Sequence, residues 1–307
     1  MAEKLALVGI GKIARDQHIP AIAGNPDWQL EAAVSRHAGV DGIDHFQTID
    51  ELLEKRPDIT TVSLAIPPQP RFEYAAKALK AGKHVMLEKP PGQSLAECYA
   101  LEALARQHGV TLFATWHSRY ADSVPALKAF LAERTLKRLK ITWKEDVRRW
   151  HPGQEWIWEP GGMGVFDPGI NALSILTEVL PYPVHLTGAT LEFPANRATP
   201  IAAGLTFADP VGAEMSADFD WRQEGPQTWD IDVETDRGAA KLSLGGEKLE
   251  IDGEPVIQGT NHEYANLYVR MADLVKSGTS DVDLSPMIHV CDAFSLGRRV
   301  ITDPFEF

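Results

Sequence analysis

Hydrophobic residues form short continuous runs in the first part of the chain, and a helical pattern follows most of them. The first run is Leu-Ala-Leu-Val-Gly at residues 5–9, and others cover residues 30–34, 59–66, 84–87 and 110–115. Continuous runs of this length are typical of strands buried on both faces of a parallel sheet. Strands that alternate with helices through short loops predict a doubly wound α/β sheet.

Side-chain signals mark where the helices between these strands begin and end. Thr48 with Glu51, and Ser94 with Glu97, have the spacing of a capping box, in which the hydroxyl accepts a hydrogen bond from the third helical amide. Gly109 follows the second of these helices and suits a left-handed C-terminal cap. We therefore expect helices to begin directly after Thr48 and Ser94.

The pattern changes after about Ser118, where strands begin to dominate. In several strands, such as Met215–Phe219, apolar and polar residues alternate, which marks a sheet that is covered on one face only. The predicted strands cover residues 139–145, 184–193, 201–207, 214–221, 229–235 and 239–244. Helices are predicted over residues 123–132, 171–180, 264–276 and 287–300.

Charge and cysteine content exclude several functions. The formal net charge is -13, and nucleic acid binding demands a basic surface. Cys98 and Cys291 both lie in predicted amphipathic helices, so we expect two buried, inert thiols and no disulfide framework. The histidines and cysteines show no metal-ligand spacing, and no serine-hydrolase elbow is present. Without a signal-peptide pattern or a membrane-length apolar run, the sequence predicts a cytoplasmic protein.

A glycine-rich motif follows the first strand. It reads Gly9-Ile10-Gly11-Lys12-Ile13-Ala14 and matches G-x-G-x-x-G/A. The first glycine permits a tight turn, the second lets a pyrophosphate approach the backbone, and the alanine keeps the next helix close to the strand. The helix N-terminus offers free N–H groups to the phosphates. The sequence therefore predicts an N-terminal dinucleotide-binding Rossmann domain, residues 1–118. An α+β substrate domain with a large open, mostly antiparallel sheet, residues 119–307, is predicted to follow.

The end of the second strand bears on the choice between NAD and NADP. A carboxylate there would hold the ribose 2′-OH of NAD, but this chain has Ser35 followed by Arg36. A hydroxyl and a guanidinium suit a 2′-phosphate. We expect NADP to be preferred or both cofactors to be used; the alternative is that Arg36 is only a solvated loop residue.

Glu88, Lys89 and Pro90 follow the strand at 84–87, at the edge where open α/β sheets bind ligands. On its own, the tripeptide fits a solvated surface loop equally well. Together with the glycine motif, Ile66-Pro67-Pro68, and Gly161-Gly162 before Asp167, it resembles the family that contains glucose–fructose oxidoreductase, inositol dehydrogenase and the rhizopine-catabolism protein. The resemblance covers essentially the whole chain. It implies that Lys89 lies near the reacting carbon and that Ile66, Pro67 and Glu88 help to bind the cofactor.

The usual motif of that family in its second domain is Asp-x-Gly-x-x-x-His, with the histidine as general base. Here Asp167 matches, but Asn171 stands where the histidine is expected. In this departure the chain resembles the branch of bacterial aldose 1-dehydrogenases that act on L-arabinose and D-galactose. The resemblance implies Asp167 as the base or its orienter, and Asn171 as a donor to sugar hydroxyls. Lys89 remains an alternative base, and without the family context Asp167 is read as a helix N-cap.

A tryptophan-rich segment provides candidate sugar contacts. Trp150, Trp156 and Trp158 lie in one Pro/Gly-containing loop, where each indole is either packed or available to a ligand. Trp150 with His151 is our first choice for contact. Weaker candidates are Trp229, which opens another strand, and His117 and Glu145, which lie at predicted strand ends.

The alternatives are a polyol dehydrogenase of the same family, for instance one acting on inositol, and a non-catalytic cofactor-sensing regulator. The Asn171 position disfavours the first, and the intact Glu88-Lys89-Pro90 and Asp167 disfavour the second. Family analogy also suggests a homodimer formed through the open sheet face.

Overall fold

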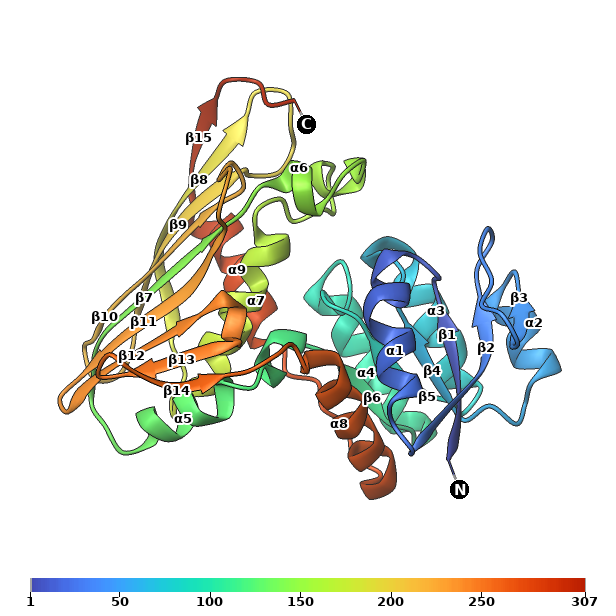
Figure 1. The fold of residues 1–307 in the computed structure, drawn as a ribbon. Helices are drawn as coiled ribbons and strands as arrows, with labels where there is room; N and C mark the ends of the chain where they lie inside the picture. Colours follow the sequence, from blue (N-terminus) through green and yellow to red (C-terminus); the bar gives the residue numbers. More distant parts are fainter. Residues whose placement is uncertain (1, 307) are drawn as a thin grey trace. The chain divides into compact units, whose positions relative to one another are not determined.

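The computed structural model describes residues 2–306, and the chain divides into two compact units (Figure 1). The first unit consists of residues up to His117 together with His262–Leu284. The second consists of Ser118–Asn261 and Ser285–Phe307. The chain passes from the first unit to the second after His117, next to the expected boundary at residue 118. The segment His262–Leu284 was expected in the second domain but packs in the first unit.

The first unit is built on a six-stranded parallel sheet with the strand order β3-β2-β1-β4-β5-β6. Its strands are β1 (Glu3–Val8), β2 (Trp28–Val34), β3 (Asp44–Phe46), β4 (Thr61–Leu64), β5 (His84–Leu87) and β6 (Leu112–Ala114). The strand order reverses between β1 and β4. This switch point is where doubly wound sheets bind ligands, beyond the carboxyl ends of the strands.

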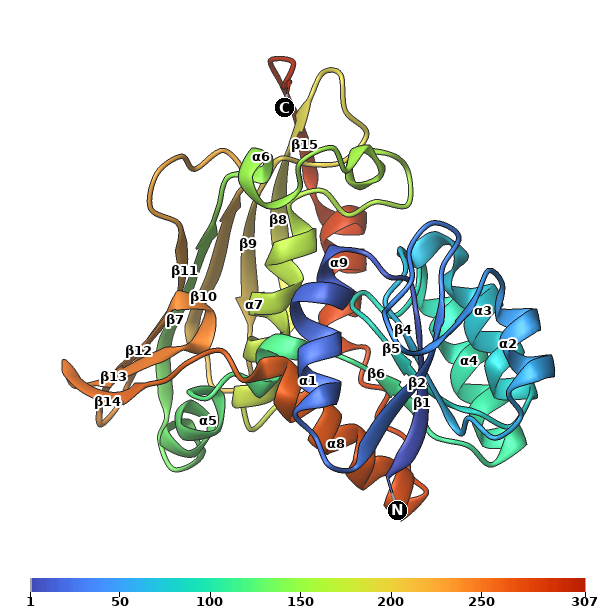
Figure 2. The same cartoon turned by 45° about the vertical axis from the view of Figure 1, so that its right-hand side comes forward.

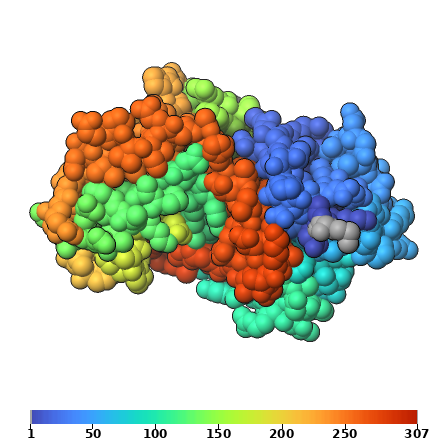
Figure 3. All heavy atoms as spheres, turned by 60° about the horizontal axis from the view of Figure 1, so that its bottom comes forward, coloured from blue at the N-terminus to red at the C-terminus, as the bar shows by residue number. Residues whose placement is uncertain are grey.

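Helices cover both faces of this sheet. They are α1 (Ile19–Ala23), which continues a π-helical turn at Ala14–His18, α2 (Ile49–Lys55), α3 (Pro68–Lys80), α4 (Leu95–His108) and α8 (Glu263–Ser277). α2 and α4 both contact α3, while α1 contacts α8, so two groups of helices form (Figure 1). Figure 3 shows α8, in orange-red, against dark blue N-terminal residues. The buried side chains between the sheet and α2–α4 form a continuous apolar core.

The second unit is built on a nine-stranded sheet with the order β14-β13-β12-β11-β7-β10-β9-β8-β15. The pairs β7–β10 and β8–β15 are parallel and the others antiparallel. The strands are β7 (Leu136–Lys144), β8 (His185–Pro194), β9 (Ala202–Ala208), β10 (Glu214–Asp220), β11 (Thr228–Thr235), β12 (Gly238–Ser243), β13 (Lys248–Ile251), β14 (Glu254–Gln258) and β15 (Arg298–Thr302). The predicted fold class, a parallel α/β sheet followed by a large and mostly antiparallel sheet, is confirmed.

Three helices pack together on one face of the nine-stranded sheet, as Figure 2 shows for α7 and α9. The helices of this unit are α5 (Val124–Ala132), α6 (Val147–Trp150), α7 (Phe166–Val179) and α9 (Ser285–Leu296). α7 comes close to the sheet at Gly169, where an added Cβ would lie 2.9 Å from the Phe219 ring. Within residues 2–306, no helix is both long enough and apolar enough to cross a membrane.

Three local expectations are wrong, and one hairpin was not predicted. The cap of α7 is Val165, so Asp167 lies inside the first turn and is not the N-cap. The helix predicted over 287–300 ends at Leu296, and β15 follows it. The hairpin of β13 and β14 was not predicted. Cys98 is buried as expected, whereas Cys291 is exposed, because it lies on the outer side of α9.

Candidate active site

The glycine motif forms the turn between β1 and the first helix, at the switch point of the sheet. Gly9 has φ +90°, and a Cβ there would lie 2.6 Å from Ile66 Cγ2 and 2.9 Å from the Ala65 carbonyl oxygen. Gly11 is different, since a Cβ there meets no atom within 4 Å. The packing of the chain therefore requires the first glycine, while the second keeps open a space in front of the helix N-terminus. Ala14 is fully buried. These features fit the pyrophosphate of a dinucleotide.

Ser35 and Arg36 follow β2 at the same edge of the sheet. The Ser35 hydroxyl accepts a hydrogen bond from the Ala38 amide (3.3 Å), and its backbone N–H donates to the Phe46 carbonyl (3.0 Å). The Ser35 side chain is therefore engaged in the turn. Arg36 is exposed, which leaves its guanidinium accessible to a ligand. Its role in cofactor choice stays a prediction.

Arg71 joins the two loops that follow β4 and β5, and no sequence pattern indicates this role. Its side chain is 2% exposed and donates to the carbonyl groups of Ile66, Glu88 and Pro90. Ile66 belongs to the loop after β4, and Glu88 and Pro90 to the loop after β5. One buried guanidinium thus holds in place the two segments that the family resemblance assigns to the cofactor site.

Glu88 is the centre of a buried polar network in the first unit. Its carboxylate accepts a hydrogen bond from the Tyr264 hydroxyl at 2.6 Å and lies 3.4 Å from the Thr115 hydroxyl. Burial opposes ionisation, but the charges of His18, His117 and Lys89 and the Tyr264 bond outweigh it and lower the pKa of Glu88. Lys89, next in the chain, is half-buried.

Two histidines flank this carboxylate, and their pKa values are shifted in opposite directions. His18 is fully buried and shares a hydrogen bond of 2.8 Å with Tyr268, and burial lowers its pKa. His117 Nδ1 lies 2.7 Å from Glu263, and its ring stacks on Tyr264 at 5.3 Å. Burial would lower the pKa of His117, but the charge and hydrogen bond of Glu263 raise it.

The structure thus places His117 in the first unit, within the Glu88 network. Its assignment as a sugar contact stays a prediction. The tyrosines and Glu263 of this network were missed because they lie on α8, which returns to the first unit from late in the chain. Nothing in their local sequence marks that return.

A second polar cluster lies in the second unit, at the end of β7. The Glu145 carboxylate accepts hydrogen bonds from two indole groups, Trp221 Nε1 at 3.2 Å and Trp229 Nε1 at 2.9 Å. His151 Nε2 lies 3.8 Å from Glu145 Oε1 and 3.5 Å from Asp167 Oδ2. Both carboxylates are more than nine-tenths buried. Glu145, His151 and Asp167 were all candidates from the sequence, and the fold brings the two carboxylates to the His151 imidazole.

The remaining candidates surround this cluster on different elements. Asn171 is half-buried on α7, one turn after Asp167, so the two share a helix face. Trp150 is 38% exposed and packs edge-on against Trp229, with ring centroids 5.5 Å apart. Trp158 is 2% exposed and packs against Trp221. Of the loop tryptophans, Trp158 therefore anchors the loop, and Trp150 offers an indole to the exterior.

These residues suit proton transfer and hydrogen bonding. In the part of the chain that the structure describes, no group of three His, Cys, Asp or Glu side chains could hold a metal ion. The first unit combines a phosphate turn with a half-buried lysine, and the second combines a buried carboxylate–imidazole cluster with an accessible indole.

Comparisons with known proteins agree with these features. Residues 4–115 match the model of a family described as "Oxidoreductase family, NAD-binding Rossmann fold". The galactose 1-dehydrogenase of Pseudomonas fluorescens is 42% identical over 302 residues, which cover 98% of each chain. A crystal structure of a D-galactose-1-dehydrogenase protein from Rhizobium etli is 55% identical, with a TM-score of 0.97 over 100% of this chain and 99% of that one.

A more distant likeness shows the fold alone. The crystal structure of a 3-ketoreductase from Actinomadura kijaniata in complex with NADP and TDP-benzene is 19% identical. Its TM-score is 0.84, over 98% of this chain and 100% of that chain. On the family model and the full-length relatives, this chain belongs to the NAD-binding oxidoreductase family of glucose–fructose oxidoreductase, inositol dehydrogenase and the rhizopine-catabolism protein.

Proposed function

We propose that this protein is an NAD(P)-dependent aldose 1-dehydrogenase, which oxidises D-galactose or L-arabinose at C1 to the aldonolactone. The observation that carries the proposal is the cluster of Glu145, His151 and Asp167 in the second unit, with Trp150 and Trp229 packed beside Glu145. The two full-length relatives named as galactose 1-dehydrogenases support the choice of sugar.

The reaction removes a hydride from C1 and a proton from the anomeric hydroxyl, and the C1–O bond becomes the lactone carbonyl. The nicotinamide dinucleotide that the glycine turn of the first unit would hold would supply the hydride acceptor. The protein has to fix the sugar so that C1 is presented for transfer, and it has to accept the proton. We assign these tasks to residues of the second unit, assisted by Lys89, which donates a hydrogen bond to the anomeric oxygen.

Asp167 is the base in this proposal. Its buried carboxylate lies in the first turn of α7, beside the His151 imidazole. Asn171, one turn further on, donates to a sugar hydroxyl but has no basic group. Lys89 is the alternative base, and a pH profile of the Asp167→Asn variant separates the two assignments.

The other members of the cluster bind and orient the sugar. Trp150 presents an indole face against which the apolar C–H face of a pyranose can lie. Glu145 is held by two indole donors and lies close to His151, so we assign it to orienting that imidazole, which then contacts sugar hydroxyls. D-galactose and L-arabinose share the configuration of their ring hydroxyls from C2 to C4, so one such site accepts both.

For the cofactor, we propose that NADP is preferred. Support comes from the exposed Arg36 directly after β2 and from the serine that takes the place of the carboxylate expected for NAD. The open space at Gly11 receives the pyrophosphate in either case.

A substrate panel tests the proposal. Purified protein is incubated with aldoses and polyols, each with NAD and with NADP, and formation of the reduced nicotinamide is followed by its absorbance. We expect the highest kcat/KM with D-galactose and L-arabinose, and higher values with NADP than with NAD. Preferential turnover of inositol or another polyol would contradict the proposal, and so would cofactor binding without turnover of any sugar.

A further inference from the structure

The last residues of the described chain form a short strap after β15, and side chains from the turn after β8 hold it. The Asn196 side chain binds both backbone groups of Phe305, because its Nδ2 donates to the Phe305 carbonyl (3.2 Å) and its Oδ1 accepts from the Phe305 amide (2.9 Å). Arg197 Nε donates to the same carbonyl at 3.1 Å. These three bonds fix the backbone from which the Phe305 ring projects.

The Phe305 ring begins a chain of aromatic contacts that leads to the candidate sugar site. Its centroid lies 5.9 Å from that of Trp158, and Trp158 lies 5.2 Å from Trp221. Trp221 packs against the His151 ring, also at 5.2 Å, and donates to Glu145. All five residues belong to the second unit. The strap and the proposed sugar-binding cluster are therefore linked through two buried indoles.

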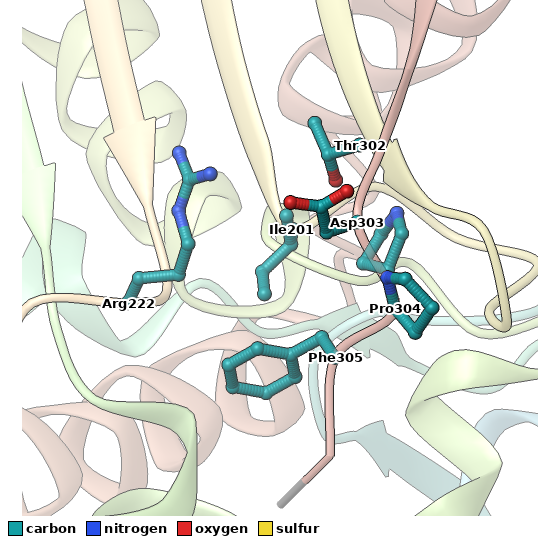
Figure 4. Close-up of a pocket in the computed structure, with 7 residues that line it drawn as sticks. Ile201, Arg222, Thr302, Asp303, Pro304 and Phe305 are labelled. Carbon is teal, nitrogen blue, oxygen red and sulfur yellow. The ribbon is translucent and has the colours of Figure 1, made fainter.

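A cavity of about 230 Å³ lies beside the strap, and Phe305 is one of the residues that line it. Figure 4 shows its lining, with Arg222, Ile201 and Thr302 around the space and the ring of Phe305 at its edge. Phe305 thus meets Trp158 and also borders open space. Removing the Phe305 ring therefore takes away one aromatic contact of Trp158 next to space that is already open, and leaves the Arg197 guanidinium as the contact that the strap's anchor makes with this indole.

Arg197 also contacts the loop that contains Trp158. Its guanidinium lies 5.4 Å from the Trp158 ring and forms an ion pair with Glu155 at 2.9 Å. Glu155 and Trp158 both belong to the short 3-10 helix Glu155–Trp158, between His151 and α7. The strap and its anchor therefore contact the loop that carries His151 at more than one point.

We propose that Phe305 is a positioning residue for sugar binding. Through Trp158 and Trp221 it holds the loop 147–164 where His151 lies beside Asp167. The assignment of the ligand as a sugar rests on the proposed function, whereas the control of the loop by the strap does not. Removing the ring lets the loop move and weakens sugar binding, while the first unit and its cofactor site are unaffected.

The test compares Phe305→Ala with Phe305→Tyr, which keeps the ring, and with Asp303→Ala, which changes an exposed strap residue outside the aromatic chain. We expect Phe305→Ala to raise the KM for D-galactose about three- to tenfold, the factor that loss of one aromatic pair corresponds to. The kcat and the cofactor KM should stay close to the wild-type values. Phe305→Tyr should restore the sugar KM, and Asp303→Ala should leave it unchanged.

Limited trypsin digestion gives a second measurement that needs no substrate. Arg149 is exposed in the same loop, and we expect faster cleavage after it in Phe305→Ala than in the wild type or in Phe305→Tyr. Arg148 contacts the Phe305 ring directly, with its guanidinium 6.0 Å from the ring centroid, so cleavage after Arg148 is compared separately. Phe305→Leu serves in both measurements if the alanine variant does not fold. An unchanged sugar KM with unchanged cleavage overturns the proposal, as does an equal effect of Asp303→Ala. If the wild type does not oxidise galactose, the proposed function fails, and the cleavage rate alone decides the role of the strap.

Discussion

Replacing Glu145 by glutamine tests the polar cluster of the second unit, because it keeps the size of the side chain and removes only its charge and one acceptor. Both carboxylate oxygens now receive an indole N–H, from Trp221 at 3.2 Å and from Trp229 at 2.9 Å. A glutamine amide has one oxygen and one NH₂ group. One of the two indole groups must therefore lose its acceptor and face a donor.

The cost follows from where each indole lies. Trp221 is fully buried, whereas Trp229 is half-buried and can turn to water. We expect the amide oxygen to stay with Trp221 and the Trp229 bond to be lost. A hydrogen bond to a charged acceptor is worth about 1.5–3 kcal/mol, and water replaces it in part, so the free energy of unfolding of the second unit should fall by about 2 kcal/mol.

Urea unfolding followed by tryptophan fluorescence measures this change, because most of the indoles report on the second unit. That unit contains six of the eight tryptophans, namely Trp143, Trp150, Trp156, Trp158, Trp221 and Trp229. Glu159→Gln, an exposed change in the neighbouring loop, is the matched control. In the double variant Glu145→Gln, Trp229→Phe the two losses should not add, because both remove the same bond. Fully additive losses, or a Glu145→Gln variant as stable as the control, would refute the reasoning.

Three further predictions concern the cofactor, the base and pH. Arg36→Ala should weaken NADP binding by about 1.5–3 kcal/mol and leave NAD binding nearly unchanged, as paired titrations would show. Equal losses of affinity for the two cofactors would contradict the assignment of Arg36 to the 2′-phosphate. Asp167→Asn should lower kcat by about 10²–10⁴ with the fold intact and abolish the acid limb of the pH profile, whereas an acid limb that survives points to Lys89. Because the folded pKa of His117 is raised above its unfolded value near 6.5, its contribution to stability is complete below that pH and is lost as pH rises through the raised pKa. Thermal melts across that window should show the loss in the wild type and not in Glu263→Gln.

Features fixed by neighbouring residues could be predicted from the sequence. The hydroxyls of Thr48 and Ser94 accept hydrogen bonds from Glu51 and Glu97 at 3.2 Å, and α4 ends at a left-handed Gly109, as the capping patterns indicate. The β13–β14 hairpin and the end of α9 were not predicted, although the sequence contains a pattern for each. Asp252-Gly253 is a hairpin turn sequence between β13 and β14. Gly297 separates α9 from β15, and a Cβ there would lie 2.4 Å from the Ala293 carbonyl oxygen.

Features that depend on tertiary packing could not be predicted. α8 was expected as a helix, but no local pattern shows that Tyr264 and Tyr268 return to the first unit and surround Glu88. Arg71 looks like an ordinary surface arginine on a helix, and only the fold turns it toward three carbonyl groups. Among the sugar-site candidates, Glu145, His151 and Asp167 were named from residue type and position, and the fold places them together; their role in sugar binding stays a prediction.

The central claim is that the protein removes the hydrogen at C1 of galactose. The carbon that gives up its hydride distinguishes this reaction from oxidation elsewhere on the sugar ring. Incubation with D-galactose deuterated at C1, and separately at C3, followed by mass spectrometry of the reduced nicotinamide, identifies that carbon. We predict that deuterium reaches the cofactor only from the C1-labelled sugar, with formation of the aldonolactone. Deuterium transferred from C3, or no transfer from either sugar, would contradict the account.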